Sequence, residues 1–315
     1  MTDQNIRTEL IAILGSDNVL TEEPMKKHTT FRIGGNADYF VTPVNAEQIQ
    51  SVVAYLKKEK IPFYVVGNGS NLLVSDEGFR GVVIQLYDKL RAFEILSEKE
   101  SETYGLEGKV CVRAQAGIML GRLGNELAAR SLAGFEFATG IPGTLGGAVR
   151  MNAGAYGGEM KDVLVNATVI DTEGNLVTMN REELKLGYRT SIIDRNQYIV
   201  VEAVLALEKG NQDEINDKIK DLAGRRRDKQ PLEYPSAGST FKRPEGYFAG
   251  KLISDAGLKG FSVGGAQVSE KHAGFVINTG DATAKDVIDL TDAVRDKVQK
   301  EYGVTLELEV RKLGF

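Results

Sequence analysis

The stretch "ADYFVTPVNAEQIQSVVAYLKKEKIPFYVVGNGSNLLVSDEGFRGVVIQL", residues 37–86, decides the fold class because the period of its apolar pattern changes along it. Residues 39–42 predict a strand, and residues 45–59 predict a helix with one apolar face. Three further strands are predicted at residues 62–66, 72–74 and 82–86. A βαβ unit followed by more strands indicates a domain that combines helices with a sheet.

The rest of the chain continues to mix helices and strands. Helical apolar spacing predicts helices over residues 2–14, 120–131, 213–227 and 283–302. We expect Thr283 to cap the last of these helices. Alternating or β-branched runs predict a strand, a turn and a strand within 90–117, several strands within 163–207, and a final strand over "TLELEVRKL", residues 305–313.

Bulk properties exclude several classes of protein. The length of 315 residues suits two or three domains, and a net charge of −5 argues against nucleic-acid binding by charge alone. We expect no membrane insertion, since no apolar run approaches the ~18–20 residues that span a bilayer, and the polar N-terminus is unlike a secretory signal. Cys111 is the only cysteine and there are two histidines, so we expect a cytoplasmic protein without disulfide or metal site.

Glycines concentrate in "ATGIPGTLGGAVRMNAGAYGG", residues 138–158. Such a segment lets backbone N–H groups approach an anionic ligand closely. A ligand loop is favoured here, whereas "GNGSN", residues 67–71, fits a ligand loop or a hairpin equally well. Because no helix follows "GNGSN", a Rossmann or P-loop motif is excluded. The ligand that fits best is large and carries phosphate, such as a dinucleotide.

The stretch "PSAGSTFKRP", residues 235–244, holds Ser239 between prolines. No G-x-S-x-G elbow surrounds Ser239, so it fits a donor of a proton or hydrogen bond to a developing anion better than an acyl nucleophile. Arg189 in "GYRTS" is a second candidate. From sequence alone, the default interpretation of the cations in "RRRDKQP" is a solvated helix end, and the carboxylates of "LELEV" are consistent with an ordinary solvent-exposed face. A core or surface position is favoured for His272 over a catalytic one.

Taken together, these motifs resemble the UDP-N-acetylenolpyruvoylglucosamine reductases of peptidoglycan synthesis. The matching motifs, in order, are "GNGSNLLV", "GIPGTLGGAVRMNAGAYGGE", "YRTSI", "KQP", "AGSTFKRP", "AGKLI", "GGAQVS", "HAGFVIN" and "LEVR". The resemblance covers nearly the whole chain. It implies an α+β protein with a two-part FAD-binding domain of the vanillyl-alcohol-oxidase/PCMH type and a C-terminal α/β substrate-binding domain. The expected boundaries are 1–88 with 304–315, 89–225, and 226–303.

The resemblance also implies a reaction and its residues. NADPH would deliver hydride to the N5 atom of non-covalent FAD, and the flavin would pass it to the enolpyruvyl group of a UDP-sugar. Ser239 would donate the proton, and Arg189 and Glu309 would assist. The substrate-binding residues expected by analogy are Tyr188, Arg226, Lys229, Arg243 and His272. The FAD-binding residues expected by analogy are Arg32, Ile33, Gly34, Gly67, Asn68, Gly69, Ser70, Asn71, Gly140, Ile141, Gly143, Gly146, Ala153 and Gly154.

The segment after "YRTSI" differs from part of that family. Here the chain runs straight into the next strand, which resembles the shorter subgroup that lacks a tyrosine-bearing insertion. We expect a monomer that binds only small molecules. A flavin-dependent oxidase and a non-catalytic nucleotide-binding protein remain alternatives. Neither His28 nor His272 lies in a loop that resembles a covalent flavin attachment site.

Overall fold

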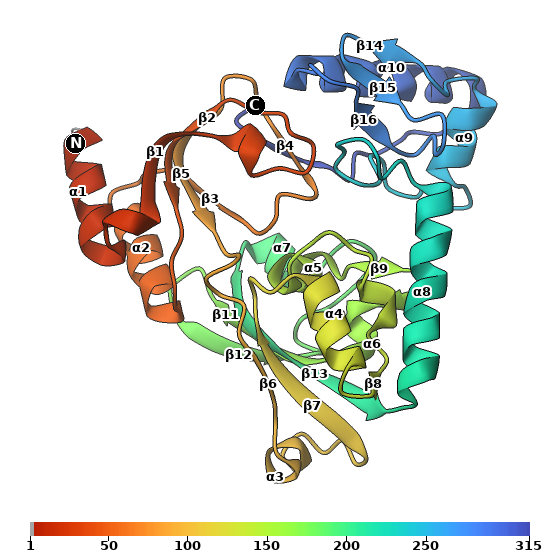
Figure 1. The fold of residues 1–315 in the computed structure, drawn as a ribbon. Coiled ribbons are helices and arrows are strands. Elements are labelled where there is room, and N and C mark those ends of the chain that lie inside the picture. The colour runs from red at the N-terminus through yellow and green to blue at the C-terminus, as the bar shows by residue number, and fades with distance from the viewer. Residues whose placement is uncertain (1–2) are drawn as a thin grey trace. The chain divides into compact units, whose positions relative to one another are not determined.

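The computed structural model describes residues 3–315 and divides the chain into two compact units (Figure 1). The first unit comprises the residues up to Leu20, Tyr39–Asn68 and Val82–Gly224. The second comprises Thr21–Asp38, Gly69–Gly81 and Arg225–Phe315. The three-domain division expected from the resemblance stays a prediction.

The N-terminal sheet has the strand order β1-β2-β5-β3, and its β3 and β5 are parallel neighbours. These strands are β1 (Val19–Pro24), β2 (Asn36–Val41), β3 (Phe63–Val66) and β5 (Phe79–Gln85). Helices α1 (Asp3–Leu14) and α2 (Ala46–Lys58) lie beside each other in Figure 1. The apolar face predicted for α2 is fully buried, at Ile49, Val52, Val53 and Leu56. These residues join Leu10, Leu14 and the strands in one core.

A second sheet, in the same unit, has the order β12-β11-β13-β7-β6, and its neighbours are antiparallel. Its strands are β6 (Phe93–Ile95), β7 (Lys109–Gln115), β11 (Leu164–Ile170), β12 (Leu176–Asn180) and β13 (Ile199–Lys209), with β8 (Leu132–Ala133) paired to β13. Figure 1 shows α4 (Leu120–Ala128), α5 (Leu145–Met151) and α6 (Met160–Val163) on one face of this sheet. Their apolar side chains and those of the strands form its core.

The sequence pattern missed the short helices of the structure, of which two lie in segments predicted to consist of strands and a turn. Residues 90–117 include α3 (Glu98–Glu102), which begins at a capping box between Ser97 and Glu100. Residues 163–207 include α7 (Ile192–Asn196), which begins at Ser191. Five-residue helices are too short to show an apolar period, so only their capping residues could have indicated them.

The second unit has a small sheet in the order β14-β15-β16, with α10 packed along it (Figure 1). The elements are α9 (Ala249–Asp255), β14 (Ser262–Val263), β15 (Ala266–Val268), β16 (Val276–Asn278) and α10 (Ala284–Tyr302). Helix α8 (Gln212–Lys229) precedes them in the chain. The core includes Leu252, Ile253, Val294 and Val298, together with Phe31 and Leu73 from earlier in the sequence.

The C-terminal strand is shorter than predicted. Only β17 (Arg311–Leu313) is a strand, and it pairs in parallel with β4 (Leu72–Val74). Upstream, Leu308 makes a single antiparallel bridge to Phe241. The burial alternation that suggested a longer strand is present only in part, since Leu306 and Val310 are buried and Glu307 is exposed, but Leu308 and Glu309 are both half-buried.

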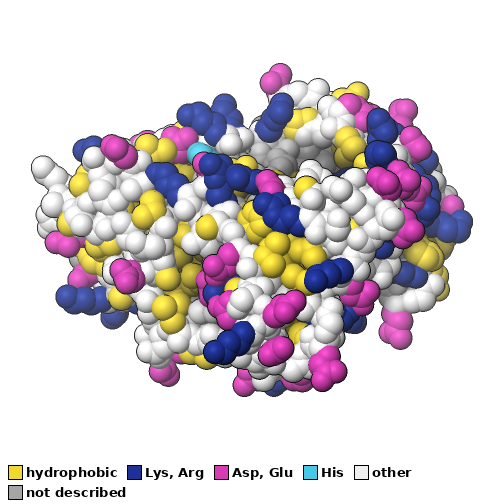
Figure 2. Space-filling model, turned by 60° about the horizontal axis from the view of Figure 1, so that its bottom comes forward, with side chains coloured by type: hydrophobic (Ala, Val, Ile, Leu, Met, Phe, Trp, Pro, Cys, Tyr) yellow, Lys and Arg dark blue, Asp and Glu magenta, His cyan; other side chains and the backbone are white. Residues whose placement is uncertain are grey.

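The surface carries both charges. Figure 2 shows Lys and Arg side chains interspersed with Asp and Glu, with hydrophobic side chains between them. None of the helices in the described range 3–315 is both long and apolar enough to cross a membrane.

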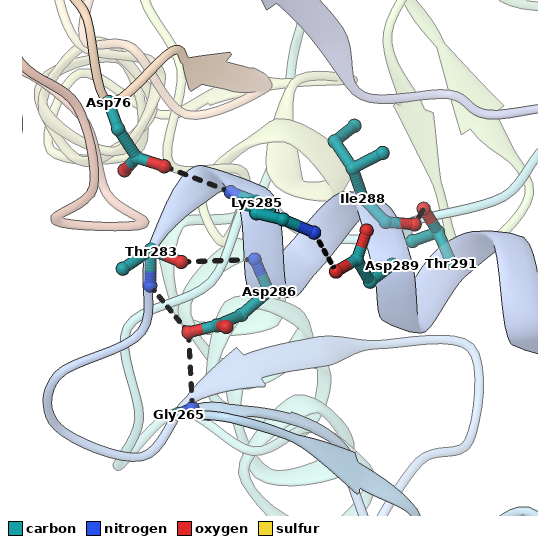
Figure 3. Close-up of polar contacts among 8 residues, drawn as sticks. All are labelled: Asp76, Gly265, Thr283, Lys285, Asp286, Ile288, Asp289 and Thr291. Atoms are coloured by element: carbon teal, nitrogen blue, oxygen red, sulfur yellow. Dashed lines mark hydrogen bonds and ion pairs between the residues drawn. The ribbon is translucent and has the colours of Figure 1, made fainter.

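The N-terminus of α10 has a complete set of hydrogen-bond acceptors (Figure 3). Thr283, the predicted N-cap, accepts the N–H of Asp286 at 3.0 Å, and the Asp286 carboxylate accepts the N–H of Thr283 at 2.9 Å. Asp76, which follows β4, accepts the N–H groups of Ala284 and Lys285 at 2.8 and 3.0 Å. Residues 72–76 therefore hold both the start of α10 and, through β17, the segment that follows it.

Candidate active site

The start of α5, which continues the glycine-rich loop, is held against the segment that follows β7. The N–H groups of Leu145 and Gly146 donate to the carbonyl oxygens of Ile118 and Ala116, at 2.9 and 2.8 Å. A Cβ on Gly146 would lie 2.8 Å from the Cβ of Ala116. This glycine is therefore required by protein packing, a reason that applies whether or not the loop binds a ligand.

The start of "GNGSN" meets this loop within the first unit. Asn68 donates from Nδ2 to the carbonyl oxygen of Pro142 at 2.7 Å. Gly67 packs on Thr144 so closely that a Cβ would lie 2.3 Å from the Thr144 hydroxyl oxygen. Two loops that the resemblance assigns to FAD are thus brought together.

Arg189 lies at the tip of a tight turn. Gly187 and Thr190 exchange backbone hydrogen bonds of 3.0 and 3.3 Å, which leaves Tyr188 and Arg189 between them. Arg189 has a left-handed backbone, with φ 54°. Its guanidinium lies 5.2 Å from the centre of the exposed Tyr188 ring and donates at 3.5 Å to the carbonyl oxygen of Gly154, in the hairpin of β9 (Gly154–Ala155) and β10 (Gly158–Glu159).

In the second unit, residues 28–34 pack against the remainder of "GNGSN". Thr30 donates its N–H to the carbonyl oxygen of Gly69 at 3.3 Å, and a Cβ on Gly69 would lie 2.1 Å from the carbonyl oxygen of His28. Gly69 also has a positive φ of 60°. Nearby, Gly34 has a φ of 133° and approaches Val74. Only glycine fits at these positions.

The "GNGSN" loop, residues 67–71, also offers backbone N–H donors to a ligand. Within the described chain, the N–H groups of Gly69 and Ser70 have no backbone acceptor, although Gly69 is buried. A buried N–H group needs a partner, and successive N–H groups around a left-handed glycine form an anion-binding nest. These donors suit a diphosphate such as that of FAD.

Ser239 and Glu309 lie on adjacent backbone segments of the second unit. Glu309 donates its N–H to the carbonyl oxygen of Thr240 at 2.9 Å, and Lys242 donates its N–H to the carbonyl oxygen of Glu307 at 2.8 Å. With the Phe241–Leu308 bridge, this register sets Glu309 opposite the residue that follows Ser239. Asn71 joins them, because its Nδ2 donates to the carbonyl oxygen of Glu309 at 3.1 Å.

Sequence reasoning missed Thr240 and Asn278, which fix this segment. Thr240 is 2% exposed and accepts the N–H of Val276 at its hydroxyl, at 2.9 Å. Asn278 donates from Nδ2 to the carbonyl oxygen of Phe31 at 3.1 Å, and from its backbone N–H to the carbonyl oxygen of Pro235 at 2.9 Å. Both residues belong to motifs of the resemblance, "AGSTFKRP" and "HAGFVIN", but nothing in the spacing of these motifs indicates the contacts.

The His272 side chain is half-buried, and its surroundings favour the neutral imidazole. Its Nδ1 accepts the N–H of Gly274 at 3.1 Å, so the proton of the neutral ring belongs on Nε2. Its ring meets Phe275 edge-to-face at 4.9 Å between centroids. Burial, with a smaller effect of the Lys259 charge, lowers the pKa of His272. The side chain can therefore serve as a hydrogen-bond donor through Nε2.

The remaining predicted substrate-binding cations are near the surface of the second unit. Arg226 and Lys229 lie in the last turn of α8, and Lys229 forms no ion pair within the part of the chain that the structure describes. Arg243 donates to the carbonyl oxygen of Tyr247 at 3.3 Å, and its guanidinium lies 3.9 Å from the centre of the Phe248 ring. Lys242, by contrast, pairs with Glu307 at 3.0 Å.

Comparison with known proteins defines the class of this fold. Residues 37–180 match the model of an FAD binding domain. The fold resembles p-cresol methylhydroxylase, with a TM-score of 0.57 at 13% identity over 95% of this chain and 87% of that one. The protein thus belongs to the class with an FAD-binding domain and a PCMH-type fold.

The family follows from the C-terminal region and from whole-chain similarity. Residues 230–313 match the C-terminal domain of UDP-N-acetylenolpyruvoylglucosamine reductase. Enzymes of that name from Lachnoclostridium phytofermentans and Clostridioides difficile are 54% and 50% identical, over 98% and 100% of this chain and 97% and 99% of their own. The chain belongs to the UDP-N-acetylenolpyruvoylglucosamine reductase family.

A solved structure agrees with this assignment. The UDP-N-acetylenolpyruvylglucosamine reductase of Thermus caldophilus is 35% identical, with a TM-score of 0.76 over 94% of this chain and 98% of that one. The predicted α+β fold with an FAD-binding domain is therefore confirmed.

Proposed function

We propose that the protein reduces UDP-N-acetylglucosamine enolpyruvate to UDP-N-acetylmuramate with NADPH as the reductant. Family membership supports the substrate, and the match to an FAD-binding domain supports flavin chemistry. The observation that supports the proton-transfer step is the backbone register that sets Glu309 opposite Thr240, the residue after Ser239.

When held by the glycine-rich segments, FAD would supply hydride for the enolpyruvyl methylene carbon, with NADPH as the source. The neighbouring carbon, which bears the carboxylate, then carries negative charge and needs a proton. Ser239 gives its hydroxyl proton to that carbon, and the resulting alkoxide regains a proton from solvent. A well-placed serine can do this because the acceptor is a strong base.

Arg189 and Glu309 have supporting roles in this reaction. The guanidinium of Arg189 stabilises the negative charge that develops over the carboxylate-bearing carbon. Glu309 orients the developing acid group of the substrate by hydrogen bonding. Arg189 belongs to the first unit, and Ser239 and Glu309 belong to the second.

The residues proposed to bind FAD belong to both units, and so do those proposed to bind the substrate. The backbone donors of Gly69 and Ser70 suit the FAD diphosphate, and the other glycine-rich segments named above complete the FAD-binding set. For the sugar nucleotide, Lys229 and Arg226 bind the diphosphate. Three further substrate contacts are proposed, at Tyr188, Arg243 and His272.

The Ser239→Ala variant tests the proton-transfer role. We expect flavin reduction by NADPH to remain near the wild-type rate, whereas reoxidation by the enolpyruvyl sugar slows by roughly 10²–10⁴-fold, as for loss of a general acid. Stopped-flow absorbance of the flavin measures both half-reactions separately.

Ser236→Ala is the matched control, since Ser236 lies in the same segment and is engaged through its backbone carbonyl. It should leave both half-reactions nearly unchanged. Equal slowing of the two half-reactions in Ser239→Ala would show that Ser239 does not donate the proton.

A further inference from the structure

The turn that carries Arg189 is anchored from outside by one buried side chain. Asn152 is 1% exposed and caps the C-terminus of α5 with a left-handed backbone, at φ 44°. Its Nδ2 donates to the carbonyl oxygen of Gly187 at 3.1 Å. That oxygen also accepts the N–H of Thr190, so the hydrogen bond from Asn152 reaches the turn itself.

The other contacts of Asn152 fix its orientation. Nδ2 also donates to the Glu159 carboxylate at 2.6 Å, and Oδ1 accepts the N–H of Lys161 at 2.9 Å. These contacts identify which amide atom is the oxygen, because only an acceptor can face the Lys161 N–H. One amide thus joins three segments: the end of α5, the hairpin that follows it, and the Arg189 turn.

Arg189 needs such an anchor. A long side chain at positive φ is held in a sparsely populated conformation, which persists only when the surrounding structure over-determines it. The guanidinium also donates to the carbonyl oxygen of Gly154, which closely follows Asn152 in the chain. Residues 152–154 therefore hold both the turn and the guanidinium of Arg189.

We propose that Asn152 is a positioning residue that holds Arg189 in the geometry needed to stabilise the developing carbanion. The proposal rests on the role proposed above for Arg189. Asn152 does not have to touch the substrate to exert this effect. Misplacement of a catalytic group by about 1 Å can reduce a rate by roughly 10²-fold.

The test is the Asn152→Gly variant, because glycine keeps the left-handed cap without strain and removes only the amide. We expect the oxidative half-reaction to slow by about 10–100-fold, while flavin reduction by NADPH changes less than about threefold. Gln197→Gly is the control, since exposed Gln197 caps α7 with a φ of 55°. It should leave both half-reactions unchanged.

A double variant separates positioning from general destabilisation. Arg189→Asn removes the guanidinium with a residue that tolerates positive φ. If Asn152 acts through Arg189, adding Asn152→Gly to Arg189→Asn slows the oxidative half-reaction no further. Multiplicative effects of the two substitutions would overturn the proposal. A wild-type oxidative rate in Arg189→Asn alone would instead overturn the role of Arg189.

Hydrogen exchange gives a readout that does not depend on turnover. The N–H groups of Gly187 and Thr190 close the turn, and we expect both to exchange faster in Asn152→Gly but not in Gln197→Gly. Unchanged exchange at both amides would show that Asn152 does not hold the turn.

Discussion

Two arginines among the proposed site residues, Arg32 and Arg189, have left-handed backbones with φ of 57° and 54°. Each such residue costs about 1–3 kcal/mol, so the surrounding structure must hold it. Arg32 donates its N–H to the carbonyl oxygen of Thr29 at 3.2 Å, and Arg189 is held by its turn. The same conformation occurs at residues outside the proposed site, such as the exposed helix cap Gln197, so it marks positions that the local structure must hold and does not by itself mark a functional residue.

His272 shows how burial sets a side chain's chemistry. Its lowered pKa means that the folded protein binds the imidazole proton less readily than the unfolded chain does. The neutral ring therefore contributes stability that is fully present above the ordinary pKa of 6.5 and is lost as the pH falls through the folded-state pKa. Protonation of the His272 ring would also put a hydrogen on Nδ1, which would then face the N–H of Gly274 instead of accepting its hydrogen bond.

His272→Gln should remove this pH dependence. We expect the wild-type free energy of unfolding to fall relative to that of the variant as the pH is lowered below 6.5, since only the wild type carries the titrating ring. Urea denaturation at several pH values on both sides of 6.5 measures the difference. Parallel pH profiles for the two proteins would contradict the assignment of a depressed pKa.

At the scale of elements, α10 depends on a residue far away in the sequence. The carboxylate of Asp76 accepts two N–H groups of its first turn, and the hydroxyl of Thr283 accepts the N–H of Asp286. Figure 3 shows the contacts of Asp76 with Lys285 and of Thr283 with Asp286. The hydrogen bonds from Thr283 lower the pKa of Asp286. An acid at this end also complements the helix dipole.

Asp76→Ala should destabilise the protein by about 1–2 kcal/mol, because it leaves two helix N–H groups without their acceptors. Asp76→Asn keeps one acceptor and should cost less. Asp281→Ala is the control, since Asp281 is an exposed acid just before the same helix. Urea denaturation gives the energies, and equal losses in Asp76→Ala and Asp281→Ala would argue for a charge effect instead of a cap.

The long helices were predictable from sequence, as were the short strands β3 and β4, whereas the short helices and the exact extent of the C-terminal strand were not. Helices α2 and α10 each bury an apolar stripe over several turns, which the sequence shows directly. By contrast, α7 and β17 are too short to carry a period, and tertiary contacts decide where they begin and end. The prediction of a longer C-terminal strand was wrong for this reason, because only residues 311–313 find a strand partner.

At the scale of the whole molecule, the FAD-binding loops should couple cofactor binding to stability. A ligand that binds only the folded state stabilises it, by about 2.7 kcal/mol at ~100 times its dissociation constant. We therefore expect FAD removal to lower the melting temperature, and added FAD to restore it in a concentration-dependent way. Differential scanning fluorimetry of the apo- and holoprotein measures this.

The holoprotein also tests the alternative function, a flavin-dependent oxidase with covalently attached flavin. Acid precipitation should release all of the flavin into the supernatant, because the cofactor is expected to be held without a covalent bond. AMP added to the apoprotein is the control for a general nucleotide effect and should shift the melting temperature less than FAD. Flavin that stays with the precipitate would indicate a covalent link and contradict the expectation.

The sequence by itself determined the mixed fold class, the long helices and the order of the motifs, because apolar period and glycine spacing are local properties. It also indicated Ser239, Arg189 and Glu309 through a resemblance. Only the tertiary structure placed Glu309 beside the Ser239 segment and hydrogen-bonded Asn152 to the turn that carries Arg189. Those hydrogen bonds join residues that are distant along the chain, and no local pattern encodes which distant backbone a buried amide will meet.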